Sequence, residues 1–409
     1  MRWWGTLGLL AAVRVAIPLA AYADRGSRLP GLPRFVRGRA DGGLSGDATG
    51  FYAATREFMA GWARMPRPLL GLLVVAALAA AVAFVVAWRR RQELRPWLVP
   101  AVVCVFGLIV CVDVHWMKPS GAAVFGWPLV WGIAELPFRG LGVLTHAVAW
   151  DVSFALQLCF VALTVVAVAY LARNASGRRW IGVLAAAFWA FWPLLAGAIA
   201  GHRAWANSQW AVDAGLHGYS EPLSTLLVVV AAALLLSERA TPLRLSLAGC
   251  ALSLATLTKL SNGLLAAAAL VLLVLRRTQW PYYLAGALSL APLVAVYWPL
   301  SYPKLFDNPK SWPRDPFDPA HVVTTWTHSS IFYPRTLLIV APLALIGVFA
   351  LRRPWALALT LAFLLINPVF YSFYANTALH PRFLYASLPF LFALWAGGVE
   401  TLRRCVARS

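Results

Sequence analysis

The chain has 409 residues, of which 61% are hydrophobic, and a formal net charge of +20. Water-soluble domains carry much less apolar sequence, so the composition excludes a soluble protein and predicts a polytopic membrane protein. The apolar runs are long and continuous rather than alternating, which indicates helices and not the strands of a barrel. The basic excess fits arginines beside anionic lipid head groups, and because no nucleic-acid motif accompanies it, we expect no nucleic-acid partner.

The apolar segments predict an all-α fold of about twelve transmembrane helices, formed by 1–409 as a single transmembrane domain with no large soluble domain. The predicted spans are 3–22, 69–88, 97–115, 152–172, 181–199, 221–236, 245–258, 261–275, 281–299, 336–351, 355–371 and 384–401. Short connections dense in arginine alternate with long mixed ones, and short basic loops stay in the cytoplasm. We therefore expect a multi-pass protein of the plasma membrane with both termini inside and its long loops on the outer face.

Three of these outer loops have distinct compositions. Loop 23–68 is rich in arginine and contains an acidic, glycine-rich stretch. Loop 116–151 is aromatic, has Glu135 and Arg139 at i, i+4 spacing, and is typical of helices that lie in the membrane interface. Loop 300–335 contains many prolines, so it is predicted to be irregular and to cover other parts of the protein.

The stretch that starts at Asp41 is the strongest candidate for chemistry. Asp47 ends a glycine-rich turn, and the sequence after it has the spacing of an amphipathic helix. The apolar positions of that pattern are Phe51, Thr55, Phe58, Met59 and Trp62. Asp47 is thus either a helix N-cap or a carboxylate held at the membrane surface for catalysis, and the two roles are compatible.

Four short motifs carry a resemblance to a known class. They are Asp47-Ala-Thr-Gly-Phe51 with Arg56-Glu57-Phe58 after it, Tyr219-Ser-Glu221-Pro, Ala255-Thr-Leu-Thr-Lys259, and His380-Pro-Arg382-Phe-Leu-Tyr. In this order over residues 1–400, they make the chain resemble the polyprenyl-phosphate-dependent glycosyltransferases of the GT-C class. That class includes protein O-mannosyltransferases, lipid-A aminoarabinose transferases, and actinobacterial mannosyl- and arabinosyltransferases. In this chain Ala48 replaces the second acid of the first motif, so the usual Asp–Glu pair for a metal is incomplete.

The resemblance implies inverting transfer of a sugar, such as mannose or arabinose, from a polyprenyl-phosphate donor to a glycan, lipid or protein acceptor at the outer face. Such a transfer needs a general base and cations that stabilise the leaving phosphate. Asp47 is the expected base and Asp41 the second candidate. The expected phosphate-binding residues are Arg382, Lys259 and Arg56, and the expected substrate-orienting residues are Glu221, His380, Tyr52 and His328. No metal site is assigned, and a divalent cation (Mg²⁺ or Mn²⁺) stays open as a cofactor.

Two alternatives remain open. A transporter or flippase of lipid-linked sugars would place polar groups at the bilayer midplane and carry inverted repeats. The predicted spans contain few charges, Arg14 being one that is expected to pair structurally, and no repeat is evident. A glycan polymerase or ligase would act on the same outer face but would require an oligosaccharide donor.

Overall fold

The computed structural model describes residues 3–23, 47–117, 125–200, 219–238, 240–306, 318–327, 334–351, 353–373 and 381–407. These residues are almost entirely helical and include no strand, which confirms the predicted all-α class for the described part of the chain. The chain divides into two compact units. The first unit comprises Met1–Ser45, Ser153–Glu238 and Pro313–Ser409, and the second comprises Gly46–Val152 and Arg239–Trp312.

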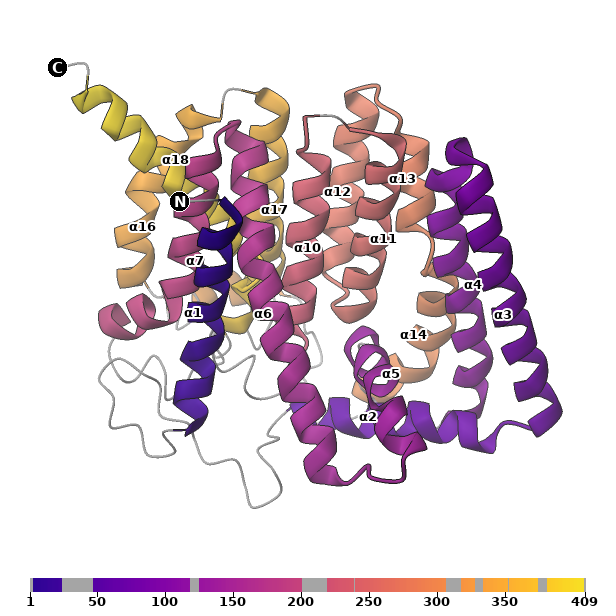
Figure 1. Cartoon of the computed structure of the whole chain (residues 1–409). Helices are drawn as coiled ribbons and strands as arrows, with labels where there is room; N and C mark the ends of the chain where they lie inside the picture. The colour runs from indigo at the N-terminus through magenta and orange to yellow at the C-terminus, as the bar shows by residue number, and fades with distance from the viewer. Residues whose placement is uncertain are drawn as a thin grey trace. The chain divides into compact units, whose positions relative to one another are not determined.

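Long and short helices from three parts of the chain form the first unit (Figure 1). Its elements are α1 (Trp3–Ala23), α6 (His146–Ser176) from Ser153 onward, α7 (Arg179–Ala200), α10 (Glu221–Leu235), α15 (Ala320–Thr327), α16 (Pro334–Gly347), η2 (Val348–Ala350), α17 (Pro354–Ser372), η4 (Pro381–Leu384) and α18 (Leu388–Val406). Helix α18 packs along both α16 and α7, and it ends with Arg403 and Arg404 in its last turn, where cations favour the helix dipole.

In the second unit several helices run side by side, and one helix, α2, runs in a different direction (Figure 1). Its elements are α2 (Asp47–Arg64), α3 (Arg67–Arg90), η1 (Gln92–Leu94), α4 (Arg95–Trp116), α5 (Gly126–Gly140), the first turns of α6, α11 (Pro242–Thr258), α12 (Asn262–Leu275), α13 (Trp280–Ala287) and α14 (Ala291–Phe306). Helix α2 runs across the ends of α3 and α4 rather than alongside them. This is the arrangement expected of a helix that lies in a membrane interface.

Six of the described helical segments are long and apolar enough to cross a membrane. They are Trp3–Ala20, Arg67–Arg90, Gln92–Trp116, His146–Ser176, Trp280–Trp298 and Pro354–Ser372, and each overlaps a predicted span. The other apolar helices are shorter: α12 has 14 residues, about 21 Å at helical rise, against a hydrocarbon core of about 30 Å. The total of twelve spans therefore stays a prediction. The span predicted over 281–299 is interrupted, because a turn separates α13 from α14.

Helix α3 shows most directly why the chain needs an apolar medium. It has 24 residues, and none of them is buried in the protein. Its surface includes Leu72, Val75 and Val82, each more than 60% exposed. A continuous apolar surface of this length is stable in lipid and not in water.

Glycines allow the closest helix contacts in both units. In the first unit, a Cβ atom on Gly398 of α18 would lie 1.8 Å from the carbonyl oxygen of Leu343 in α16. In the second unit, a Cβ atom on Gly249 of α11 would lie 2.2 Å from the carbonyl oxygen of Tyr283 in α13. Small residues let backbones approach in this way, and this packing replaces the hydrophobic driving force that is absent between helices in lipid.

Candidate active site

Helix α2 begins at Asp47, as the sequence pattern predicts. Its buried face is formed by Phe51, Thr55, Phe58 and Met59, and this face packs against α4 and α5. The Thr55 hydroxyl donates to the carbonyl of Phe51 at 2.9 Å, so its polar group is satisfied within the helix. The expected amphipathic helix is therefore present, and Asp47 is its first residue; the side chain of Asp47 lies outside the described residues.

An ion pair fixes α2 to α5. Nη2 of Arg56 lies 2.6 Å from each carboxylate oxygen of Glu135. The Glu135 side chain has no exposed surface, whereas that of Arg56 is 31% exposed. Burial raises the pKa of Glu135 above the ordinary range of glutamate, although the charge of Arg56 and, less strongly, that of Arg139 act to lower it. Glu135 therefore depends on Arg56 for the compensation of its charge.

An aromatic cluster adjoins this ion pair through Tyr52. The Arg56 guanidinium carbon lies 4.7 Å from the ring centroid of Tyr52. The Tyr52 ring in turn contacts Trp131 at 5.7 Å and meets His146 edge-on at 4.9 Å. Trp131 is fixed because its Nε1–H donates to the carbonyl of Ala149 at 3.1 Å. Tyr52 and Arg56 are both partly exposed, so they present an aromatic and cationic surface to whatever binds beside α2.

Lys259 lies at the opposite end of α5. It follows the last residue of α11, in the turn before α12, and only 9% of its surface is exposed. The backbone N–H of Phe125 donates to the carbonyl of Leu257 at 3.1 Å, which attaches the start of α5 to this turn. Glu135 is nine residues beyond Gly126 along α5, a separation of about 14 Å at helical rise. A single phosphate could contact both Lys259 and Arg56 only if both side chains turned toward each other.

Glu221 belongs to the first unit, where it is the first residue of α10 and is buried. Nearby, Nη2 of Arg14 donates to the hydroxyl of Tyr385 at 3.3 Å, and the guanidinium lies 5.7 Å from the ring of Trp189. Tyr385 interacts electrostatically with both Arg14 and Glu221. Arg14 thus has the structural pairing expected of an arginine within an apolar helix.

The remaining predicted residues fall outside the described structure in whole or in part. Arg382 lies in η4, and its side chain is not described. Asp41, His328 and His380 lie outside the described residues. The structure thus brings Tyr52 and Arg56 together, and it leaves the roles assigned to Asp47, Asp41, Lys259, Glu221, Arg382 and the two histidines as predictions.

Two buried acids were not assigned a role from the sequence. Glu135 was noted only for its spacing from Arg139, and its ion pair with Arg56 spans 79 positions. Asp113 of α4 is fully buried, and neither carboxylate oxygen has a hydrogen-bond partner among the described residues. It packs against Gly61 of α2, where an added Cβ atom would lie 2.5 Å from Oδ1. The sequence feature that could have indicated Asp113 is a single acid near the end of the apolar segment 97–115.

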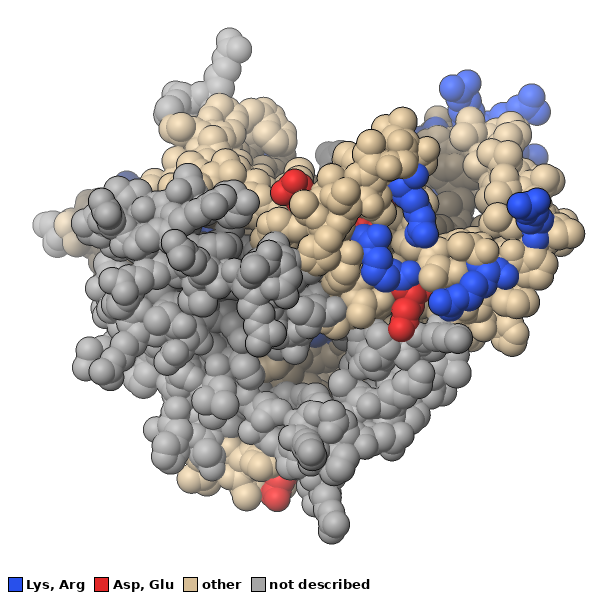
Figure 2. All heavy atoms as spheres, turned by 90° about the horizontal axis from the view of Figure 1, so that it is seen from below, with Lys and Arg blue, Asp and Glu red and all other residues tan. Residues whose placement is uncertain are grey.

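Figure 2 shows basic side chains next to acidic ones on the face of the second unit where α2 lies. Within the described part of the chain, no three histidine, cysteine, aspartate or glutamate side chains are grouped so as to hold a metal ion. We therefore assign no ligands for Mg²⁺ or Mn²⁺. Comparison of the chain with protein-family profiles, with characterised proteins and with solved structures finds no significant match.

Proposed function

We propose that the protein is an inverting glycosyltransferase that takes a sugar from a polyprenyl-phosphate donor at the outer face of the plasma membrane. The observation that carries the proposal is the placement of Asp47 as the first residue of α2, an amphipathic helix that crosses the ends of α3 and α4 and is attached to α5 by the Arg56–Glu135 ion pair. A carboxylate at the start of an interfacial helix can meet a lipid-linked donor and a polar acceptor together.

The reaction requires one bond to form and one to break at the anomeric carbon. The acceptor hydroxyl oxygen attacks that carbon from the face opposite the phosphate, and Asp47 takes the hydroxyl proton. The bond between the anomeric carbon and the phosphate oxygen breaks, and its electron pair leaves with the polyprenyl phosphate. Cationic side chains stabilise this leaving group, and in the second unit Lys259 is the residue we assign to it.

The geometry of α2 supports a more specific assignment for Tyr52 and Arg56. The partly exposed Tyr52 ring, supported by Trp131 and His146, offers a surface on which a sugar ring can pack. Arg56 already pairs with Glu135, so in this proposal its first task is to hold α2 in place. Its unused N–H groups contact the donor phosphate when the Arg56 and Lys259 side chains turn toward each other.

The decisive experiment measures sugar transfer by the purified chain with polyprenyl-phosphate mannose and polyprenyl-phosphate arabinose as donors. Asp47→Asn should abolish transfer and leave membrane insertion unchanged, while Asp41→Asn should retain it. Glu57→Gln is the matched control, because it removes a carboxylate from the same helix. Full transfer by Asp47→Asn would remove the assignment of the base.

Two arms of the same experiment address other functions. Movement of the labelled donor across vesicles without consumption of the sugar would identify a transporter. Transfer that occurs only with oligosaccharide donors, in a series of increasing donor length, would identify a polymerase or ligase.

A further inference from the structure

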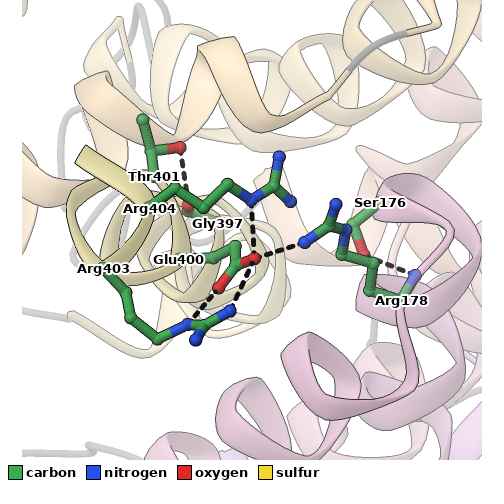
Figure 3. Close-up of polar contacts among 7 residues, drawn as sticks. All are labelled: Ser176, Arg178, Gly397, Glu400, Thr401, Arg403 and Arg404. Carbon is green, nitrogen blue, oxygen red and sulfur yellow. Dashed lines mark hydrogen bonds and ion pairs between the residues drawn. The ribbon is translucent and has the colours of Figure 1, made fainter. Parts of the chain in front are cut away.

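A second polar cluster lies in the first unit, where the turn between α6 and α7 meets the end of α18 (Figure 3). Its centre is Glu400, whose side chain has no exposed surface. The carboxylate accepts hydrogen bonds from Nε of Arg403 at 2.9 Å and from Nε of Arg404 at 2.7 Å. It also accepts a hydrogen bond from Nη1 of Arg178, which lies in the turn between α6 and α7.

The charges of this cluster do not balance. One carboxylate faces three guanidinium groups, so two positive charges remain uncompensated among them. A buried carboxylate needs one well-placed cation to offset its desolvation. Arg403 meets that need, since it makes two of the hydrogen bonds to Glu400. Compensation of one carboxylate therefore accounts for one of the three arginines and leaves two in excess.

Within the described part of the chain, most of the donors of Arg178 and Arg404 have no acceptor. Each guanidinium uses one N–H group toward Glu400 and has five in all. The side chains are 38% and 28% exposed, respectively, and Figure 3 shows the terminal nitrogens of Arg404 directed away from Glu400. Two arginine forks that a shared carboxylate orients in advance suit the oxygens of a phosphate group. Arg353 of the same unit differs, because it donates to the backbone carbonyls of Asn174 and Leu236.

The surroundings of the cluster indicate where that phosphate comes from. Arg403 lies over the ring of Trp180 at 5.7 Å, and Trp180 is 37% exposed. Leu402 and Val406, on the same end of α18, are exposed as well. A soluble anion would gain nothing from this apolar surface, whereas the acyl chains of a lipid would cover it. The cluster also belongs to the short arginine-rich connections that the sequence places at the cytoplasmic leaflet, where anionic lipids are concentrated.

We propose that Arg178 and Arg404, oriented by Glu400, bind the phosphate head group of an anionic phospholipid at the inner face of the membrane. This binding does not depend on the glycosyltransferase proposal, because it involves neither the donor nor any residue assigned to catalysis.

The test compares lipid binding by the wild-type chain and by Arg178→Gln/Arg404→Gln. Phosphatidylglycerol, phosphatidylcholine and inorganic phosphate are each titrated against the full-length protein in detergent, and the shift of the thermal midpoint is recorded. Phosphatidylglycerol should raise the wild-type midpoint saturably, and the double variant should bind it at least about 10-fold more weakly, the loss expected when even one charge-assisted hydrogen bond to the phosphate is removed. Arg403 still pairs with Glu400 in this variant, so the fold should be retained.

The matched control is Arg89→Gln/Arg90→Gln, which removes the same charge from exposed positions at the end of α3. Its affinity for phosphatidylglycerol should equal that of the wild type. An equal loss in the control would reduce the effect to net charge and overturn the proposal. So would an unchanged affinity in the Arg178 and Arg404 variant, or stabilisation of the wild type by inorganic phosphate as strong as that by the lipid. Should the double variant fail to fold, Arg404→Lys alone should weaken lipid binding, because it keeps the charge and loses the fork.

Discussion

Removal of Arg56 should cost more stability than removal of the charge of Glu135, although both changes break the same ion pair. Arg56→Met leaves a carboxylate with no exposed surface and without its cation, which typically costs about 3–5 kcal/mol. Glu135→Gln leaves a guanidinium that is 31% exposed and can be hydrated, so the loss should be about 1.5–3 kcal/mol, that of one charge-assisted hydrogen bond. Arg56→Met/Glu135→Met removes both charges and should recover most of the stability.

The pH dependence tests the same reasoning. Burial already raises the pKa of Glu135, and Arg56 is the largest opposing influence, so Arg56→Met should raise that pKa further. A raised pKa means that the folded state binds the proton more tightly than the unfolded state. The stability of Arg56→Met should therefore increase as the pH falls through the folded pKa toward about 4.3, by up to about 1.4 kcal/mol for each pH unit. Arg56→Met/Glu135→Met should show no such gain.

The assay is thermal unfolding of the detergent-solubilised variants, followed by tryptophan fluorescence over about pH 5–8. Equal destabilisation by Arg56→Met and Glu135→Gln at neutral pH would refute the reasoning, because it would mean that the buried carboxylate has another source of compensation. A loss in Arg56→Met that does not recover on acidification would point to lost packing rather than to an uncompensated charge.

Three further predictions concern packing, burial and substrate contact. Gly398→Ala should lower the thermal midpoint, since the added Cβ atom would lie 1.8 Å from the backbone carbonyl oxygen of Leu343. Gly263→Ala should not lower it, because the nearest atom to its added Cβ would be 3.4 Å away. Equal midpoints for the two variants would contradict the close helix contact. Asp113→Asn should leave the midpoint unchanged or raised, because the carboxylate has no hydrogen-bond partner among the described residues, and a clear decrease would reveal a partner. Tyr52→Leu should raise the KM for the donor about 2- to 10-fold in the transfer assay, the loss expected for one ring contact. Tyr52→Phe keeps the ring and should keep the wild-type KM. Equal KM values for the two variants would exclude ring packing against the sugar.

The sequence predicts those parts of the fold that follow from local patterns. Apolar length predicted the helices that the structure forms at 67–90 and 354–372, and spacing predicted that α2 would begin at Asp47 and bury Phe58. The Arg56–Glu135 pair could not be predicted, because its partners are 79 positions apart and meet only when α2 packs on α5. Glu135 has a nearer cation in sequence, Arg139, and helical spacing alone favours that neighbour.

The contacts of individual arginines explain why the net charge of +20 does not indicate one function. Arg14 bonds to Tyr385 within the first unit, Arg353 bonds to backbone carbonyls, and Arg56 compensates a buried acid of the second unit. In each case a polar group of the protein itself pairs with the guanidinium, so the residue has a structural role whether or not it also has another. The cluster at Glu400 differs because three arginines share one acid, so two guanidinium groups exceed what its charge requires. In this protein an excess of arginines over acids within one cluster, beside exposed apolar side chains, thus indicates an anion site better than the number of positive charges on a loop does.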